Sequence, residues 1–102
     1  MKYVITENRL ENFFKNYLDS FLETKSIDDL TNFILISQRA QDNDDVWEDF
    51  MEFDYTDGRL WVNRDVFKTL NDIFNFDKET LMTLVKQWFE NRFNVNIKFI
   101  ES

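Results

Sequence analysis

The dipeptide Asp57-Gly58 constrains the fold of this chain most, because Gly58 is the only glycine among 102 residues and proline is absent. An Asp-Gly pair flanked by alternating apolar and polar residues is typical of a two-residue type I′ turn between antiparallel strands. Such a turn pairs Tyr55 with Leu60, Asp54 with Trp61 and Phe53 with Val62. The apolar face of this hairpin then comprises Met51, Phe53, Tyr55, Leu60 and Val62. The polar face comprises Glu52, Asp54, Arg59, Asn63 and, as its one aromatic residue, Trp61. Turn chemistry and hydrophobic alternation agree, so the sequence predicts a hairpin with one face in the core.

Apolar residues at helical spacing predict three helices. The first is expected to begin after Thr6 as N-cap, and the others after Asn63 and Asp77, each of which has an N-capping side chain. The stripe of the first helix is Leu10, Phe13, Phe14, Tyr17, Leu18, Phe21 and Leu22. That of the second is Val66, Phe67, Leu70, Ile73 and Phe74, before a break at Asn75 and Phe76. That of the third is Leu81, Leu84, Val85, Trp88, Phe89 and Phe93.

The remaining segments complete a small sheet. Residues 24–30 are expected to form a polar connector that includes a helical turn at 26–29. Residues 41–45 are expected to form a loop. The run 33–36 is short, partly β-branched and apolar on both faces, which favours a central strand in a sheet covered on both sides. A helix over 26–38 is the alternative. Alternation of Val95, Ile97 and Phe99 with polar residues predicts a last strand. The fold class is therefore α+β, a single domain over 1–102 in the order α-β-β-β-α-α-β.

The composition excludes several kinds of chemistry. Cysteine and histidine are absent, which excludes disulfides, thiolate nucleophiles, zinc fingers and a Ser-His-Asp triad. The spacing Asp42-x-Asp44 resembles the start of a calcium loop, but that loop requires Gly and Glu where this chain has Trp47 and Phe53. No cofactor and no enzymatic activity are expected. No apolar run approaches the roughly 20 residues of a membrane helix. The apolar segment at residues 1–5 ends at the polar Thr6 and is too short for the core of a signal peptide. We therefore expect a cytoplasmic protein that does not bind membranes.

Residues 65–93 resemble a helix-turn-helix in outline, with Lys78, Lys86 and Arg92 on the second helix. The sequence pI near 4.4 argues against direct nucleic-acid binding, which relies on basic contacts to phosphates. A helical hairpin packed into the core is the interpretation that we favour.

Acidic residues concentrate in one window. Eight of the 20 acids lie between Asp42 and Asp57, and this window contains no Lys or Arg, so it accounts for the whole net charge of -8. Aromatic residues are interleaved with these acids. Three interpretations remain open: a solvated face that aids solubility, a docking surface for a basic protein, and a mimic of nucleic acid. The candidate partner-binding residues are Asp44, Asp45, Glu48, Asp49, Glu52, Asp54 and Trp61. Trp61 belongs either to this surface or to a second core beneath a helix or residues 3–5.

Two blocks of the sequence resemble a known group of proteins. The opening MKYVITENRL leading into Tyr17-Leu18-Asp19, and residues 60–74 continuing through VKQWFE to Phe93, are similar to small uncharacterised proteins encoded by AT-rich tailed phages. This resemblance carries no diagnostic motif and no functional residues. It implies a viral accessory protein acting in the host cytoplasm, and leaves open whether that protein belongs to the virion or binds a host target.

The leading hypothesis is a non-enzymatic interaction module that engages a basic protein surface through its acidic hairpin region. The first alternative is a structural virion protein or other self-assembling homo-oligomer, in which the aromatic residues make the contacts. The second is an enzyme in which carboxylates hold a metal ion.

Overall fold

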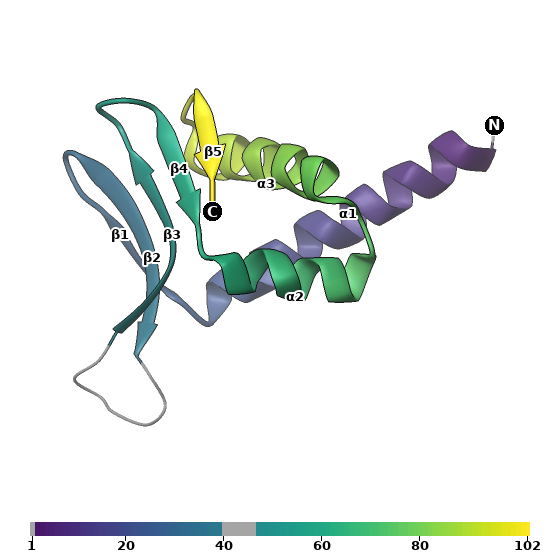
Figure 1. Cartoon of the computed structure of the whole chain (residues 1–102), viewed down its shortest axis with the longest axis horizontal. Helices are drawn as coiled ribbons and strands as arrows, with labels where there is room; N and C mark the ends of the chain where they lie inside the picture. Colours follow the sequence, from purple (N-terminus) through teal and green to yellow (C-terminus); the bar gives the residue numbers. More distant parts are fainter. Residues whose placement is uncertain (1, 40–46) are drawn as a thin grey trace.

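The computed structural model describes residues 2–39 and 47–102, without the side chains of residues 2–8, Leu10 and Arg39 (Figure 1). The elements in chain order are α1 (Lys2–Glu23), β1 (Ser26–Asp29), β2 (Phe33–Arg39), β3 (Trp47–Asp54), β4 (Arg59–Val62), α2 (Arg64–Phe74), α3 (Lys78–Phe93) and β5 (Phe99–Glu101). The strands form one sheet in the order β1-β2-β3-β4-β5, antiparallel except for the parallel pair β4-β5. The α+β class is confirmed, with one strand more than the sequence predicts.

All three helices pack on the same side of the sheet (Figure 1). The helix-facing side of the three central strands is buried at Ile34 and Ile36 of β2, Met51 and Phe53 of β3, and Leu60 of β4. The expectation of a sheet covered on both faces is therefore wrong. That expectation came from the short apolar run in β2, whose residues Phe33 and Leu35 point to the other side of the sheet and are only partly buried. We call this other side of the sheet the open face. No described helix is long and apolar enough to cross a membrane.

The hairpin of β3 and β4 differs from its prediction in register but not in facing. Phe53 pairs with Leu60 and Asp54 with Arg59, so the loop has four residues instead of two. Gly58 has φ +71° and donates its N–H to the Asp54 carbonyl at 2.9 Å. The Asp54 carboxylate accepts from Thr56 N at 2.8 Å, and these bonds stabilise the longer loop. A shift of two residues preserves the alternation, but it moves Tyr55 out of the strand and leaves it 42% exposed.

The segment 26–29 forms an edge strand, so neither the helical turn there nor the alternative helix over 26–38 exists. Ile27 pairs with Ile36, and Leu30 N donates to the Phe33 carbonyl at 2.8 Å to close the turn. Backbone pairing with β2 stabilises this strand, although Ser26–Asp29 has little apolar alternation of its own. The predicted strand over 33–36 is confirmed and extends to Arg39. The predicted loop at 41–45 lies outside the described residues.

The helices follow their predicted stripes closely. The Asn63 side chain accepts from Asp65 N, and Asp77 accepts from Thr80 N, so both predicted caps are confirmed. Helix α1 begins at Lys2, so the prediction of an N-cap at Thr6 is wrong. The buried residues of the three helices are Phe14, Leu18, Leu22, Val66, Phe67, Leu70, Leu81, Leu84, Val85, Trp88 and Phe89. Phe13 and Ile73 lie at the margins of their stripes and are 63% and 51% exposed.

The last strand begins later than the alternation from Val95 predicts. Ile97 is buried, but its N–H donates to the Glu90 carboxylate at 2.9 Å, so it is bound to α3 instead of to a strand. Lys98 N and Phe99 N then both donate to the Gly58 carbonyl, at 2.8 and 3.2 Å. A Cβ on Gly58 would lie 2.9 Å from Lys98 Cγ. The hairpin loop therefore anchors the start of β5, and only glycine fits both the backbone angle and the close approach.

Phe53 tests whether the helix-facing side of the sheet carries the stability of the fold. Phe53 is 2% exposed and lies 5.8 Å from the Phe89 ring of α3. Phe53→Ala should lower the free energy of unfolding by about 3–5 kcal/mol, measured by urea denaturation. Glu52→Ala, one residue away on the open face, should change it by less than about 0.5 kcal/mol. Equal losses from both substitutions would contradict the assignment of the two faces.

Asp77 gives the cap of α3 a dependence on pH. Side-chain and backbone hydrogen bonds from Thr80 lower the pKa of Asp77 from its ordinary value of 3.8. Because the pKa is depressed on folding, this stabilisation is present above pH 3.8 and is lost as the pH falls through the lower folded pKa. Asp77→Asn keeps a neutral cap, so the melting temperatures of wild type and variant should converge as the pH falls from about 6 to about 2. Asp72→Asn, an exposed change on α2, should show no such convergence.

Candidate functional site

The open face carries a row of four side chains at neighbouring positions of four strands. Leu35 of β2 pairs with Glu52 of β3, Glu52 with Trp61 of β4, and Trp61 with Glu101 of β5. Directly opposed residues on one face of a sheet have Cβ atoms about 5 Å apart. The indole of Trp61 therefore lies between two carboxylates, one from each neighbouring strand.

A second row lies one pleat away on the same face. It runs from Phe33 through Asp54 and Arg59 to Phe99. Phe99 is 60% exposed, and Arg59 is the cation of this row. The Arg59 guanidinium lies 3.8 Å from Asp57 and 3.7 Å from Glu101. These pairs are about half exposed, so each contributes at most about 1 kcal/mol and can exchange partners readily.

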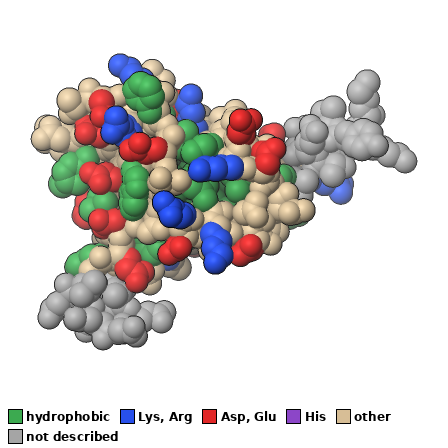
Figure 2. Space-filling view, viewed as in Figure 1, with side chains coloured by type: hydrophobic (Ala, Val, Ile, Leu, Met, Phe, Trp, Pro, Cys, Tyr) green, Lys and Arg blue, Asp and Glu red, His purple; other side chains and the backbone are tan. Residues whose placement is uncertain are grey.

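The two rows border a shallow cleft of about 370 Å³. Its lining consists of five carboxylates, one guanidinium and one indole, namely Asp49, Glu52, Asp54, Asp57, Glu101, Arg59 and Trp61. Figure 2 shows acidic and apolar side chains interleaved over the strands. The cleft is thus strongly negative, with an aromatic surface among the carboxylates.

The hairpin loop fixes two of these carboxylates through the backbone. Asp54 accepts from Thr56 N, and Asp57 accepts from Arg59 N at 3.0 Å. Nearby, the Tyr55 hydroxyl donates to Asp29 at 3.0 Å, which connects the loop to β1. Burial raises the pKa of Tyr55, and the hydrogen bond and charge of Asp29 raise it further, so this hydroxyl stays protonated at neutral pH. The loop end of the cleft is therefore held in one geometry.

The structure brings together part of the predicted site. Asp49, Glu52, Asp54 and Trp61 line one cleft. Glu48 is exposed next to them on β3, opposite Gln38, and does not line it. Asp44 and Asp45 lie outside the described residues. Trp61 lies on the open face and is partly buried. The described helices, including residues 3–5 in α1, pack on the other side of the sheet and therefore do not cover it.

Sequence reasoning missed Asp57, Arg59 and Glu101 as lining residues. Asp57 lies in the four-residue loop and Arg59 directly follows it, so the correct loop geometry would have indicated both. Glu101 reaches the cleft through the parallel pairing of β5 with β4, 40 residues away from Trp61 in sequence. Nothing in the local pattern around Glu101 signals that pairing.

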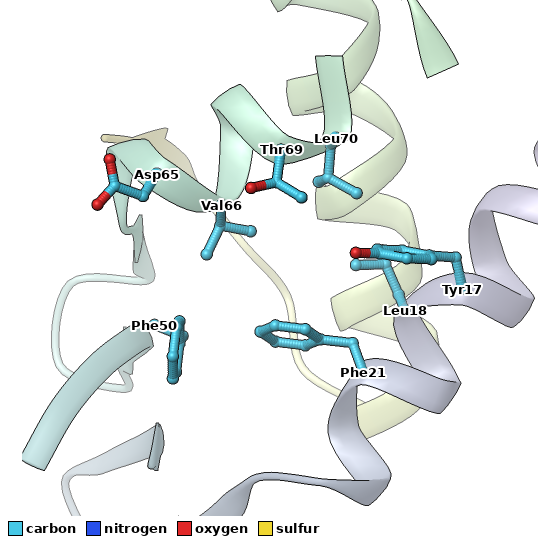
Figure 3. A pocket seen from close by; sticks show the side chains of 8 residues that line it. All are labelled: Tyr17, Leu18, Phe21, Phe50, Asp65, Val66, Thr69 and Leu70. Atoms are coloured by element: carbon cyan, nitrogen blue, oxygen red, sulfur yellow. The ribbon is translucent and has the colours of Figure 1, made fainter. Parts of the chain in front are cut away.

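A separate apolar cavity of about 110 Å³ lies between α1, α2 and β3 (Figure 3). A β-bulge at Ile36 and Ser37 leaves Phe50 unpaired with β2, and its ring meets Phe21 edge-on at 5.4 Å. The side chains of Phe21 and Val66 point into the cavity, whereas the carboxylate of Asp65 points away. Lys25 Nζ lies over both rings, 4.5 Å from the Phe21 centroid, and burial lowers the pKa of Lys25. This cavity is chemically unlike the acidic cleft and offers space for a small apolar group.

Among the described side chains, no group of three or more carboxylates is arranged to hold a metal ion. Comparison of the chain with protein-family models, with curated proteins and with solved structures finds no match.

Proposed function

We propose that this chain is a non-enzymatic interaction module whose open face docks onto a basic partner protein. The observation that carries the proposal is the position of Trp61 between Glu52 and Glu101 in one cross-strand row. A Lys or Arg side chain of the partner would lie over the indole and meet a carboxylate on either side. A cation over Trp is stabilised by about 0.5–2 kcal/mol before any carboxylate contributes.

The composition of the open face supports this proposal in two ways. Uncovered aromatic residues, Trp61 and Phe99, supply the contact area that binding hot spots need. The surrounding carboxylates attract a basic surface over distance and raise the rate of encounter, most strongly at low salt. Mimicry of nucleic acid is one form of this function, in which the carboxylates occupy a phosphate-binding site on the partner.

The resemblance to proteins of AT-rich tailed phages supports a phage accessory protein, and leaves open whether that protein belongs to the virion or binds a host target in the cytoplasm. Self-assembly is the second candidate function. It is favoured by Phe99, which is 60% exposed on the short edge strand β5. Sedimentation separates the two: docking predicts a monomer that binds a basic partner, whereas self-assembly predicts association of the pure protein. The metal-dependent enzyme has no supporting arrangement among the described side chains and is not proposed.

Trp61 is the first test of the docking surface. Trp61→Ala should weaken binding of a Lys- and Arg-rich peptide about tenfold, measured by calorimetry, because it removes the cation–π surface and its contact area. Trp61→Phe, which keeps a smaller ring, should weaken it less. The melting temperature of Trp61→Ala should fall far less than that of Phe53→Ala. Undiminished peptide affinity in Trp61→Ala would remove Trp61 from the site.

Charge reversal is the second test. Glu52→Lys together with Glu101→Lys should abolish capture of the basic peptide, because both carboxylates beside the indole become cations. Asp54 is left intact because its carboxylate stabilises the hairpin loop. Glu23→Lys with Asp72→Lys changes the net charge equally, on helices away from the open face, and is the matched control. Equal losses in the two double variants would show that net charge alone attracts the peptide, and would refute a docking site.

A further inference from the structure

A groove between α2 and α3 has the opposite character to the open face. It has a volume of about 430 Å³ and is lined by Arg64, Lys68 and Lys78, with Asn71 and Ser102 beside them and Phe67 and Leu81 beneath. Three of the 12 basic residues of the chain thus border one groove, and no Asp or Glu side chain lines it. In a chain with a net charge of -8, such a cluster is contrary to the overall composition.

These three cations lack carboxylate partners among the described residues. Both ion pairs found there belong to Arg59. Another surface cleft that contains a cation, that of Arg92, also contains Asp19 and Glu23. Unpaired cations repel one another. An anionic ligand in the groove would relieve this repulsion, so the cluster favours such a ligand.

Secondary structure sets the spacing of the cations. Arg64 and Lys68 are one helical turn apart on α2, on the same side of that helix. Lys78 begins α3 across the groove. The turn between the helices is held by Asn75 in the left-handed region and by the Asn71 side chain, which donates to the Phe76 carbonyl. Phe67 and Leu81 are buried in the core, so the floor of the groove is rigid.

We propose that this groove binds a small molecule carrying a diphosphate or two separate phosphate groups. Three cations spread over more than one helical turn complement an anion with several charges better than a single carboxylate. The volume lies within the range of small-ligand sites, about 300–1,000 Å³. Figure 2 shows Lys and Arg side chains gathered over the part of the molecule where α2 and α3 lie. The groove lies between helices, whereas the proposed docking surface is the open face of the sheet. The two sites approach each other at the last residues of the chain, because Ser102 lines the groove and Glu101 lines the cleft.

The test is a titration of the full, ¹⁵N-labelled chain with inorganic pyrophosphate at constant ionic strength. Saturable amide shifts are expected in residues 64–71 and 78–81. Lys68→Gln and Lys78→Gln should each raise the dissociation constant about tenfold, the effect of losing one charge-assisted contact. All three lining cations are exposed, so these substitutions should leave the fold intact. Lys86→Gln, elsewhere on α3, is the matched control and should leave the dissociation constant unchanged.

Several outcomes would overturn the site. Shifts that do not saturate, or that spread equally over Lys15, Lys86 and Arg92, would mean that pyrophosphate associates only through general charge attraction. An equal loss in Lys86→Gln and Lys68→Gln would mean the same. Association of the pure chain that pyrophosphate reverses, and that Glu52→Lys with Glu101→Lys abolishes, would show that the acidic face of a second copy occupies the groove. Unchanged pyrophosphate binding in that last double variant would support the small-molecule site and separate it from the open face.

Discussion

The two-residue alternation of β3 and β4 is the constraint on which the rest of the molecule depends. It directs Met51, Phe53, Leu60 and Val62 toward the helices, where all four are buried. The same alternation directs Glu52, Asp54 and Trp61 to the open face. Core and candidate site are therefore two sides of one hairpin, and a slip of one residue would exchange them. Burial of the apolar face therefore fixes the register of the hairpin, and with it the positions of the side chains that line the cleft.

Local patterns predicted the parts of the fold that local forces determine. The caps at Asn63 and Asp77 and, apart from the exposed Ile73, the stripes of α2 and α3 are confirmed, because capping and helical periodicity act within a few residues. The hairpin faces were also right except at Tyr55, which lies in the loop and is exposed, although the register was not. A loop of four residues ending in Gly58 satisfies the same glycine requirement as a type I′ turn and preserves the alternation.

The remaining features depend on pairings between distant segments. Ser26–Asp29 has no strand pattern and is a strand because β2 pairs with it. The sequence also does not show that all the helices cover one face of the sheet. Phe33 and Leu35 are apolar, which predicts a covered second face, but both are only partly buried. Four of the seven predicted site residues, Asp49, Glu52, Asp54 and Trp61, do line one cleft. Glu52, Asp54 and Trp61 do so because they alternate along one hairpin, and Asp49 joins them because of the bulge at Phe50. Glu101 joins them only through the parallel pairing of β5.

The late position of β5 in the chain has a consequence for the order of assembly. Strands β1 to β4 form a meander of neighbours in sequence, so their contacts can form while the chain is being synthesised. Strand β5 follows α2 and α3 in the chain, so its pairing with β4 closes a long loop, and it begins at the carbonyl of Gly58. Glu101, the second carboxylate beside Trp61, arrives with it. A nascent or partly folded chain therefore carries an incomplete cleft, in which Trp61 has a carboxylate on one side only.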